Sequence, residues 1–235
     1  MTHKSRIFQI NETSILVEFD EKIDQNLLSY LLHLKKELST DSHEQVLQII
    51  NAYNSLLIIY KFTINNFYDV KKRILEKISD VNIGNNLKLP IKKIPVCYDL
   101  DYGWDLELLS ENLDLSIDQI IKKHSEVIYT VFFIGFLPGF PYLGGLDSLL
   151  FYRRKSKPRR QILAGSVGIA DKQTGIYPID SPGGWQIIGR SPIQLFNKNH
   201  SEQLCFLQAG DRIQFERISK DEFEYIQSQT NYNKW

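Results

Sequence analysis

The sequence predicts a small α+β domain followed by an all-β domain whose sheet is closed or nearly closed. Three observations lead to this prediction. Strand-like and helix-like patterns alternate between Ser14 and Ser79. A stretch rich in Asn, Gly and Pro without periodicity, Val81–Pro90, then interrupts them, which is typical of a linker. Beyond Tyr129, short apolar runs alternate with Gly and Pro turns as far as Phe215, a pattern typical of barrels.

The first domain has the predicted order β-α-β-β-α. A strand over Ser14–Phe19 precedes a helix over Ile23–Leu38, in which leucines recur at helical spacing. Two apolar runs, Gln45–Ala52 and Ser55–Phe62, flank a short polar turn and predict a hairpin. Asn66–Ser79 has apolar residues on one helical face. This order indicates helices packed on one face of an antiparallel sheet.

The second domain begins with a predicted strand over Ile91–Tyr98. Two short helices follow, Leu106–Asn112 and Ser116–Ser125, and Ser116 is a suitable N-cap for the second. A strand over Tyr129–Phe133 opens the series of short strands. We therefore place the α+β domain at residues 1–82, the linker at 83–92 and the barrel domain at 93–235.

The composition argues against several classes of function. The 28 Lys and Arg balance the 28 Asp and Glu, so the net charge of zero argues against a nucleic-acid or anionic-membrane partner. No run is apolar enough for a membrane span, and the N-terminus lacks a signal-peptide core. We expect a cytoplasmic protein. Cys97, Cys205 and the histidines show no ligand spacing, so we expect reduced thiols and no metal site.

The region from Gly135 to Gly184 is the predicted functional region. It holds nine of the 13 glycines and five of the eight prolines, which commits it to one loop geometry. Phe140 and Trp185 either plug a barrel end or wall a pocket. Arg190 is either an anion clamp, because its planar fork suits a carboxylate, or a structural tie to a loop carbonyl.

Other polar residues also have two interpretations each. Ser166 and Gln173 offer groups that bind an amide or a carboxylate, although the surrounding glycines also suit a tight turn or a β-bulge. His124, near the end of a predicted helix, is a surface or capping residue, or a general base. Asp105 is a helix N-cap in a solvated acidic run, or part of a cation site.

Several motifs in order carry a family resemblance. The matching runs are GFLPGFPYLGGLD (135–147), AGSVGIA (164–170), QTGIYP (173–178), SPGGWQIIGR (181–190) and AGDRIQF (209–215). They resemble the B component of bacterial ATP-dependent 5-oxoprolinase, whose family is also called the allophanate hydrolase subunit 1 or Kip-type kinase-inhibitor family. The resemblance covers residues 93–215 well. It implies that the second domain is a cyclophilin-like β-barrel.

The resemblance also implies a function. Members act with 5-oxoprolinase subunits A and C to open the lactam of 5-oxo-L-proline to L-glutamate, and ATP is bound by a partner subunit or at a shared site. Other branches inhibit a sporulation-type sensor histidine kinase without chemistry, or belong to allophanate- and urea-degrading amidohydrolases. The cyclophilin-like fold alone would also suggest a peptidyl-prolyl isomerase, but a fold by itself does not establish an activity.

Site residues follow from the motifs. We predict catalytic roles for His124, Ser166 and Gln173. The predicted substrate-binding residues are Phe140, Arg154, Arg159, Tyr177, Trp185 and Arg190. The basic run departs from the pattern Pro-Arg-Arg-x-x-Pro-Arg of many members, because Arg153 replaces the first Pro and Lys155 the second Arg. A lysine cannot copy a bidentate guanidinium.

Overall fold

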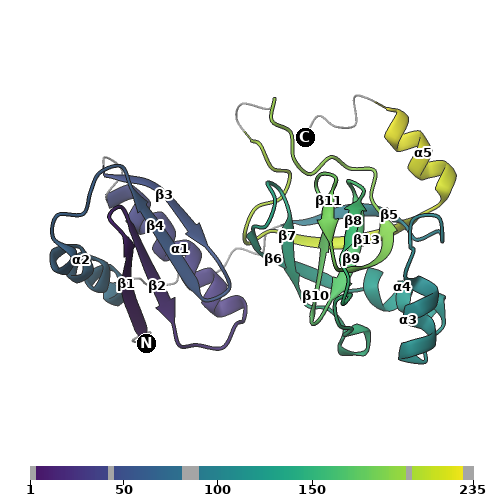
Figure 1. Ribbon diagram of the computed structural model, residues 1–235, viewed down its shortest axis with the longest axis horizontal. Helices are drawn as coiled ribbons and strands as arrows, with labels where there is room; N and C mark the ends of the chain where they lie inside the picture. Colours follow the sequence, from purple (N-terminus) through teal and green to yellow (C-terminus); the bar gives the residue numbers. More distant parts are fainter. Residues whose placement is uncertain (1–3, 42–44, 81–89, 200–202, 230–235) are drawn as a thin grey trace. The chain divides into compact units, whose positions relative to one another are not determined.

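The structure, a computed structural model, divides the chain into two compact units, residues 1–88 and 89–235, each with its own hydrophobic core (Figure 1). It describes residues 4–41, 45–80, 90–199 and 203–229. Most of the predicted linker, 83–92, lies outside the described residues. The predicted strand over Ile91–Tyr98 is confirmed as β5 (Ile91–Cys97), so Ile91 and Lys92 belong to this strand and not to the linker.

The first unit contains an antiparallel sheet in the order β1-β2-β4-β3. Its strands are β1 (Ser5–Asn11), β2 (Ser14–Phe19), β3 (Val46–Asn51) and β4 (Ser55–Tyr60). The predicted hairpin is confirmed as β3 and β4. Strand β1 was not predicted, because Phe8 and Ile10 are apolar yet exposed, which blurs the alternation that marks a strand at the sheet edge.

Helices α1 (Gln25–Asp41) and α2 (Phe67–Asp80) complete the first unit. Helix α1 begins where the Asp24 carboxylate accepts hydrogen bonds from the backbone N–H groups of Asn26 and Leu27, both at 2.9 Å. Inward side chains of the sheet, such as Val17, share one buried cluster with inward side chains of α1 and α2. The helices therefore bury the same face of the sheet.

The second unit contains a closed barrel, as predicted. Among the described residues, seven strands close it in the order β10-β7-β6-β13-β5-β12-β9, and β8 and β11 form a separate ribbon. Strands β5 and β13 run parallel. The strands are β5 (Ile91–Cys97), β6 (Ile128–Ile134), β7 (Pro141–Gly144), β8 (Arg159–Ile162), β9 (Ser166–Ala170), β10 (Gln173–Ile176), β11 (Ser181–Gly183), β12 (Gln186–Arg190) and β13 (Arg212–Ile218).

Helices α3 (Leu106–Leu113) and α4 (Ile117–Ser125) lie side by side between β5 and β6 in the chain (Figure 1). Ser116 caps α4 as predicted, in a reciprocal pair with Gln119. A short 3-10 turn, η1 (Ser148–Leu150), follows β7. Helix α5 (Lys220–Ser228) was not predicted, although Ser219 and Glu222 have the spacing of a capping box and form one.

His124 lies in the barrel core and is fully buried, so its prediction as a surface or capping residue is wrong. Its Nε2 is 2.9 Å from the Thr174 hydroxyl, which already donates to the carbonyl of Gly168. Nε2–H is therefore the donor, and Nδ1 accepts from the Tyr98 hydroxyl at 2.8 Å. Burial lowers the pKa of His124 from 6.5 to about 3, so the ring is neutral.

This histidine makes the barrel sensitive to acid. In the unfolded chain, His124 takes up a proton below about pH 6.5. In the folded chain, it stays neutral down to about pH 3. The contribution of His124 to the free energy of unfolding is therefore at its full value above pH 6.5. It falls by about 1.4 kcal/mol for each pH unit below 6.5. We expect His124→Gln to remove that slope between these pH values.

The measurement is denaturant unfolding followed by tryptophan fluorescence. Trp104 and Trp185, the two tryptophans among the described residues, both belong to the second unit, so their fluorescence reports the unfolding of that unit. Subtracting the variant's stability from that of the wild type at each pH cancels the other titrating groups. Parallel curves for the two proteins across this range would contradict the assignment.

Candidate functional site

The carboxylate of Asp105, just before α3, is the centre of a buried polar network. Its Oδ1 accepts hydrogen bonds from Arg159 Nη2 and Lys155 Nζ, both at 2.8 Å. Its Oδ2 accepts from Arg159 Nη1 at 2.8 Å and from the backbone N–H of Ile187 at 2.6 Å. Asp105 is only 2% exposed, and its side chain makes no helix-cap bond. Asp105 is thus the N-cap residue of α3, as predicted, but it is buried instead of solvated and its side chain does not cap the helix.

The protonation of Asp105 follows from these contacts. Burial by itself raises the pKa of a carboxyl group, because it disfavours the charged form. The hydrogen bonds from Arg159, Lys155 and Ile187 outweigh that effect and hold the pKa of Asp105 below its usual value. Asp105 is therefore a charged partner of Arg159. This arginine serves an internal carboxylate, a geometry that does not support its predicted role in substrate binding.

The segment from Tyr152 to Lys157 forms a basic loop beside this network. It borders a cavity of about 510 Å³, called here the basic cavity, which is lined among others by Tyr152, Arg153, Arg154, Lys155, Lys157 and Gln186. No carboxylate and no imidazole is among the described residues that line it. The cavity therefore offers cations, a phenol and an amide, which suit binding of an anion.

Three aromatic side chains pack behind the loop. Phe140 meets both Tyr177 and Trp185 at right angles, with ring centroids 5.2 Å apart in each case. All three are buried, as in a barrel-end plug. Burial raises the pKa of Tyr177 to about 12, so its hydroxyl stays protonated. Gly183 allows this packing, because a Cβ there would lie 2.3 Å from the Tyr177 hydroxyl oxygen.

Two of the predicted arginines differ in their surroundings. Arg154 is exposed, donates through Nε to Asp171 at 3.2 Å, and lies with its guanidinium 5.9 Å from the Trp185 ring. Arg190 donates through Nε to the carbonyl of Ala164 at 2.9 Å and stacks near Phe223 of α5. The structural tie foreseen for Arg190 is therefore present, and Arg154 is the one that lines the basic cavity.

The predicted catalytic residues are not brought together. Ser166 is buried at the start of β9, whereas the half-buried Gln173 pairs with Ala170 at the other end of the same hairpin. His124 is sealed in the core. Catalysis by these residues stays a prediction that this geometry does not support. Sequence reasoning missed the role of Asp105, because its partners Lys155 and Arg159 lie 50 and 54 residues away in the sequence and no local signal connects them.

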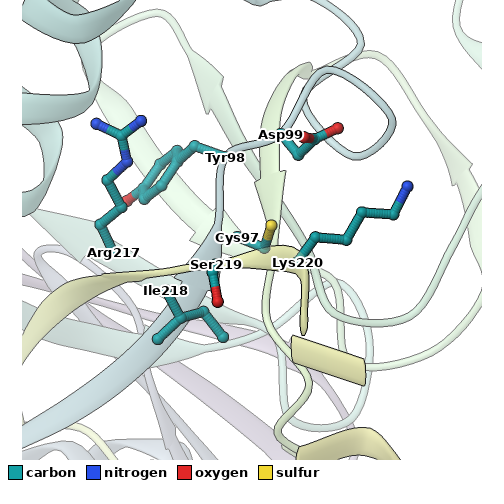
Figure 2. Close-up of a pocket in the computed structure, with 7 residues that line it drawn as sticks. All are labelled: Cys97, Tyr98, Asp99, Arg217, Ile218, Ser219 and Lys220. Atoms are coloured by element: carbon teal, nitrogen blue, oxygen red, sulfur yellow. The ribbon is translucent and has the colours of Figure 1, made fainter. Parts of the chain in front are cut away.

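A second cavity of about 510 Å³ lies where β5 and β13 end (Figure 2). Figure 2 shows Arg217 and Lys220 pointing away from each other. Arg217 pairs with Asp118 at 3.0 Å, and Lys220 pairs with Asp101. Burial raises the pKa of the Cys97 thiol in its wall, which disfavours the reactive thiolate. These side chains do not converge on one ligand, so this cavity is the weaker candidate.

We expect Asp105→Asn to destabilise the second unit by about 3 kcal/mol, because it leaves two half-buried cations without their carboxylate. The matched control is Asp171→Asn, which removes an exposed pair and should cost about 0.5 kcal/mol or less. Asparagine tolerates the positive φ of position 171. Denaturation followed by tryptophan fluorescence compares the two variants. Equal losses in the free energy of unfolding would contradict the central role of Asp105 in the network.

Comparisons with known proteins identify the family. The family described as carboxyltransferase domain, subdomain C and D, matches residues 5–207. The B subunit of 5-oxoprolinase from Bacillus subtilis (strain 168) is 33% identical over 241 residues, which cover 98% of this chain and 100% of that protein. The protein of the same name from Haemophilus influenzae is 40% identical over 174 residues, which cover 74% and 80% of the two chains.

A solved structure supports the fold. The K. lactis urea amidolyase superposes with a TM-score of 0.81 at 19% identity, covering 100% of this chain and 16% of that one. At this identity the likeness concerns the fold alone. In the part of the chain that the structure describes, no helix has the length and apolar character to cross a membrane. The resemblance seen in the motifs is thus confirmed: the chain belongs to the carboxyltransferase-domain family, subdomain C and D, and to the family of the 5-oxoprolinase B subunits.

Proposed function

We propose that this chain is the B subunit of an ATP-dependent 5-oxoprolinase, which opens the lactam of 5-oxo-L-proline to L-glutamate together with subunits A and C. The observation that carries this proposal is the 33% identity to a 5-oxoprolinase B subunit over the full length of that relative. Because the reaction consumes ATP, we place the complex in the cytoplasm.

The chemistry explains why partners are needed. A lactam is resonance-stabilised, and coupling its opening to ATP implies that phosphorylation activates the carbonyl oxygen before water attacks. Such a reaction needs groups that bind phosphate, a donor that stabilises the developing oxyanion, and a base. The residues lining the basic cavity include cations and hydrogen-bond donors but, among those described, no carboxylate or imidazole. We therefore assign the base to a partner subunit.

This chain then contributes binding groups. Arg154, which is exposed beside the Trp185 ring, is the residue we assign to an anionic group of the substrate. Gln173 on β10 remains a candidate for a hydrogen bond to the substrate amide. ATP is held by a partner subunit or at a site shared with one.

The decisive experiment is co-expression of the chain with its candidate A and C partners. We expect glutamate release from 5-oxoproline that requires ATP and disappears when this chain is omitted. Arg154→Ala should lower the rate about tenfold, the loss typical of one charge-assisted hydrogen bond. Arg160→Ala is the control, since Arg160 is an exposed arginine in the neighbouring strand that does not line the cavity.

A complex that assembles but releases no glutamate would contradict the proposal. It would favour the two branches that the motifs left open, namely a regulator of a sensor histidine kinase without chemistry of its own, and a component acting on a different amide such as allophanate. Full activity in the absence of this chain would exclude a role in the reaction.

A further inference from the structure

The basic cavity carries an excess of positive charge that the described part of the chain does not neutralise. Of its four cationic side chains, Lys155 pairs with the buried Asp105, and Arg154 pairs with Asp171. Arg153 and Lys157 are exposed, and within the described residues no carboxylate lies within 4.0 Å of either. Two positive charges at the cavity are therefore left without a partner in this part of the chain.

The loop that carries these charges is held in place by its backbone. Tyr152 and Asp171 exchange backbone hydrogen bonds at 3.2 and 2.7 Å. The N–H of Lys155 donates to the carbonyl of Gly184 at 2.7 Å. The Gln186 side-chain amide donates to the carbonyl of Arg153 at 3.0 Å. Because the backbone is ordered before any ligand arrives, binding costs little conformational entropy in the loop.

Lys155 adds a further constraint. Its ammonium group bridges Asp105 at 2.8 Å and the Gln186 side-chain oxygen at 3.2 Å, so it is directed toward the buried network. The two cations without a described partner, Arg153 and Lys157, lie on either side of it in the sequence. Because Lys155 is turned toward the buried network, the cations available to a ligand in the cavity are Arg153, Lys157 and the exposed Arg154.

We infer that the basic cavity is a binding site for the phosphoryl group of a small molecule. A phosphoryl dianion matches two unpaired positive charges, whereas a single carboxylate would leave one of them unmatched. Guanidinium groups suit phosphate oxygens because their planar donors bind in pairs, and lysine adds a point charge. A cavity of about 510 Å³ has room for more than the phosphoryl group, which fits a phosphorylated metabolite or nucleotide.

This site concerns the chain alone and does not depend on the reaction proposed above. It would give this chain its own phosphate contacts, where the family resemblance implied only that ATP binds to a partner or at a shared site. The zero net charge of the chain argues that the ligand is a small molecule and not a nucleic acid.

Isothermal titration calorimetry on the full chain tests this site with inorganic phosphate, phenyl phosphate and acetate as probes. We expect saturable binding of both phosphates and at least about tenfold weaker binding of acetate. The double variant Arg153→Ala/Lys157→Ala should weaken phosphate binding at least about tenfold, because both side chains are exposed and their removal leaves the fold intact. Tryptophan fluorescence verifies that the variant is folded.

The matched control is Arg160→Ala/Lys36→Ala, which removes the same two kinds of charge from exposed positions outside the cavity. It should bind phosphate like the wild type. Equal losses in the two double variants, acetate binding as tight as phosphate binding, or no saturable phosphate binding to the wild type would each overturn the assignment.

These outcomes are distinguishable from those of the glutamate assay. Phosphate binding by a chain whose complex releases no glutamate would leave the site standing and reject the proposed function. An active complex whose isolated chain and Arg153→Ala/Lys157→Ala variant both fail to bind phosphate would reject the site and retain the function.

Discussion

The buried carboxylate of Asp105 is the interaction on which the candidate site depends. It gathers hydrogen bonds from three separate segments, namely the basic loop through Lys155, strand β8 through Arg159, and strand β12 through Ile187. A charge removed from water is costly unless all its acceptor positions are used. Four donors at 2.6 to 2.8 Å meet that requirement, so the three segments are joined at one point.

This arrangement sorts the basic residues into two groups. Those that reach Asp105 are part of the buried network, and the Arg159 guanidinium also lies 5.4 Å from the centre of the Trp104 ring. Those that do not reach it remain exposed around the basic cavity. The same loop is backed by the buried rings of Phe140, Tyr177 and Trp185, which are a rigid support because aromatic rings have few rotatable bonds. Cations that reach Asp105 and cations that remain exposed thus lie within one short segment, residues 153–159.

The barrel interior follows the same rule of satisfied polar groups. His124, Tyr98 and Thr174 form a hydrogen-bonded chain that ends on the carbonyl of Gly168, and Phe215 stacks on the imidazole with ring centroids 4.4 Å apart. Every donor in this chain has an acceptor, which makes a buried polar core tolerable. The protein therefore uses its best candidate base to organise the core. This agrees with our proposal that a partner subunit supplies the base.

Local signals in the chain were enough to predict the architecture. Hydrophobic periodicity, the turn residues and the Ser116 cap act over a few residues each, and they placed the sheet with its two helices and the closed barrel correctly. The motifs between Gly135 and Phe215 were also enough to identify the family. Two elements were missed. The alternation of β1 is masked by exposed apolar residues, and α5 was overlooked although the capping box at its Ser219 can be read from the sequence.

The roles of the polar residues, in contrast, emerge only from contacts between distant segments. Asp105 and Arg159 are far apart in the chain, and nothing local indicates that one neutralises the other. For Arg190 the sequence left two roles open, and its contacts with the Ala164 carbonyl and the Phe223 ring show that the structural tie is present. The electrostatic role of a charged side chain depends on its burial and on its nearest opposite charge. Both are set by folding, so a pattern of residue types predicts a basic site but not which of its cations remain available.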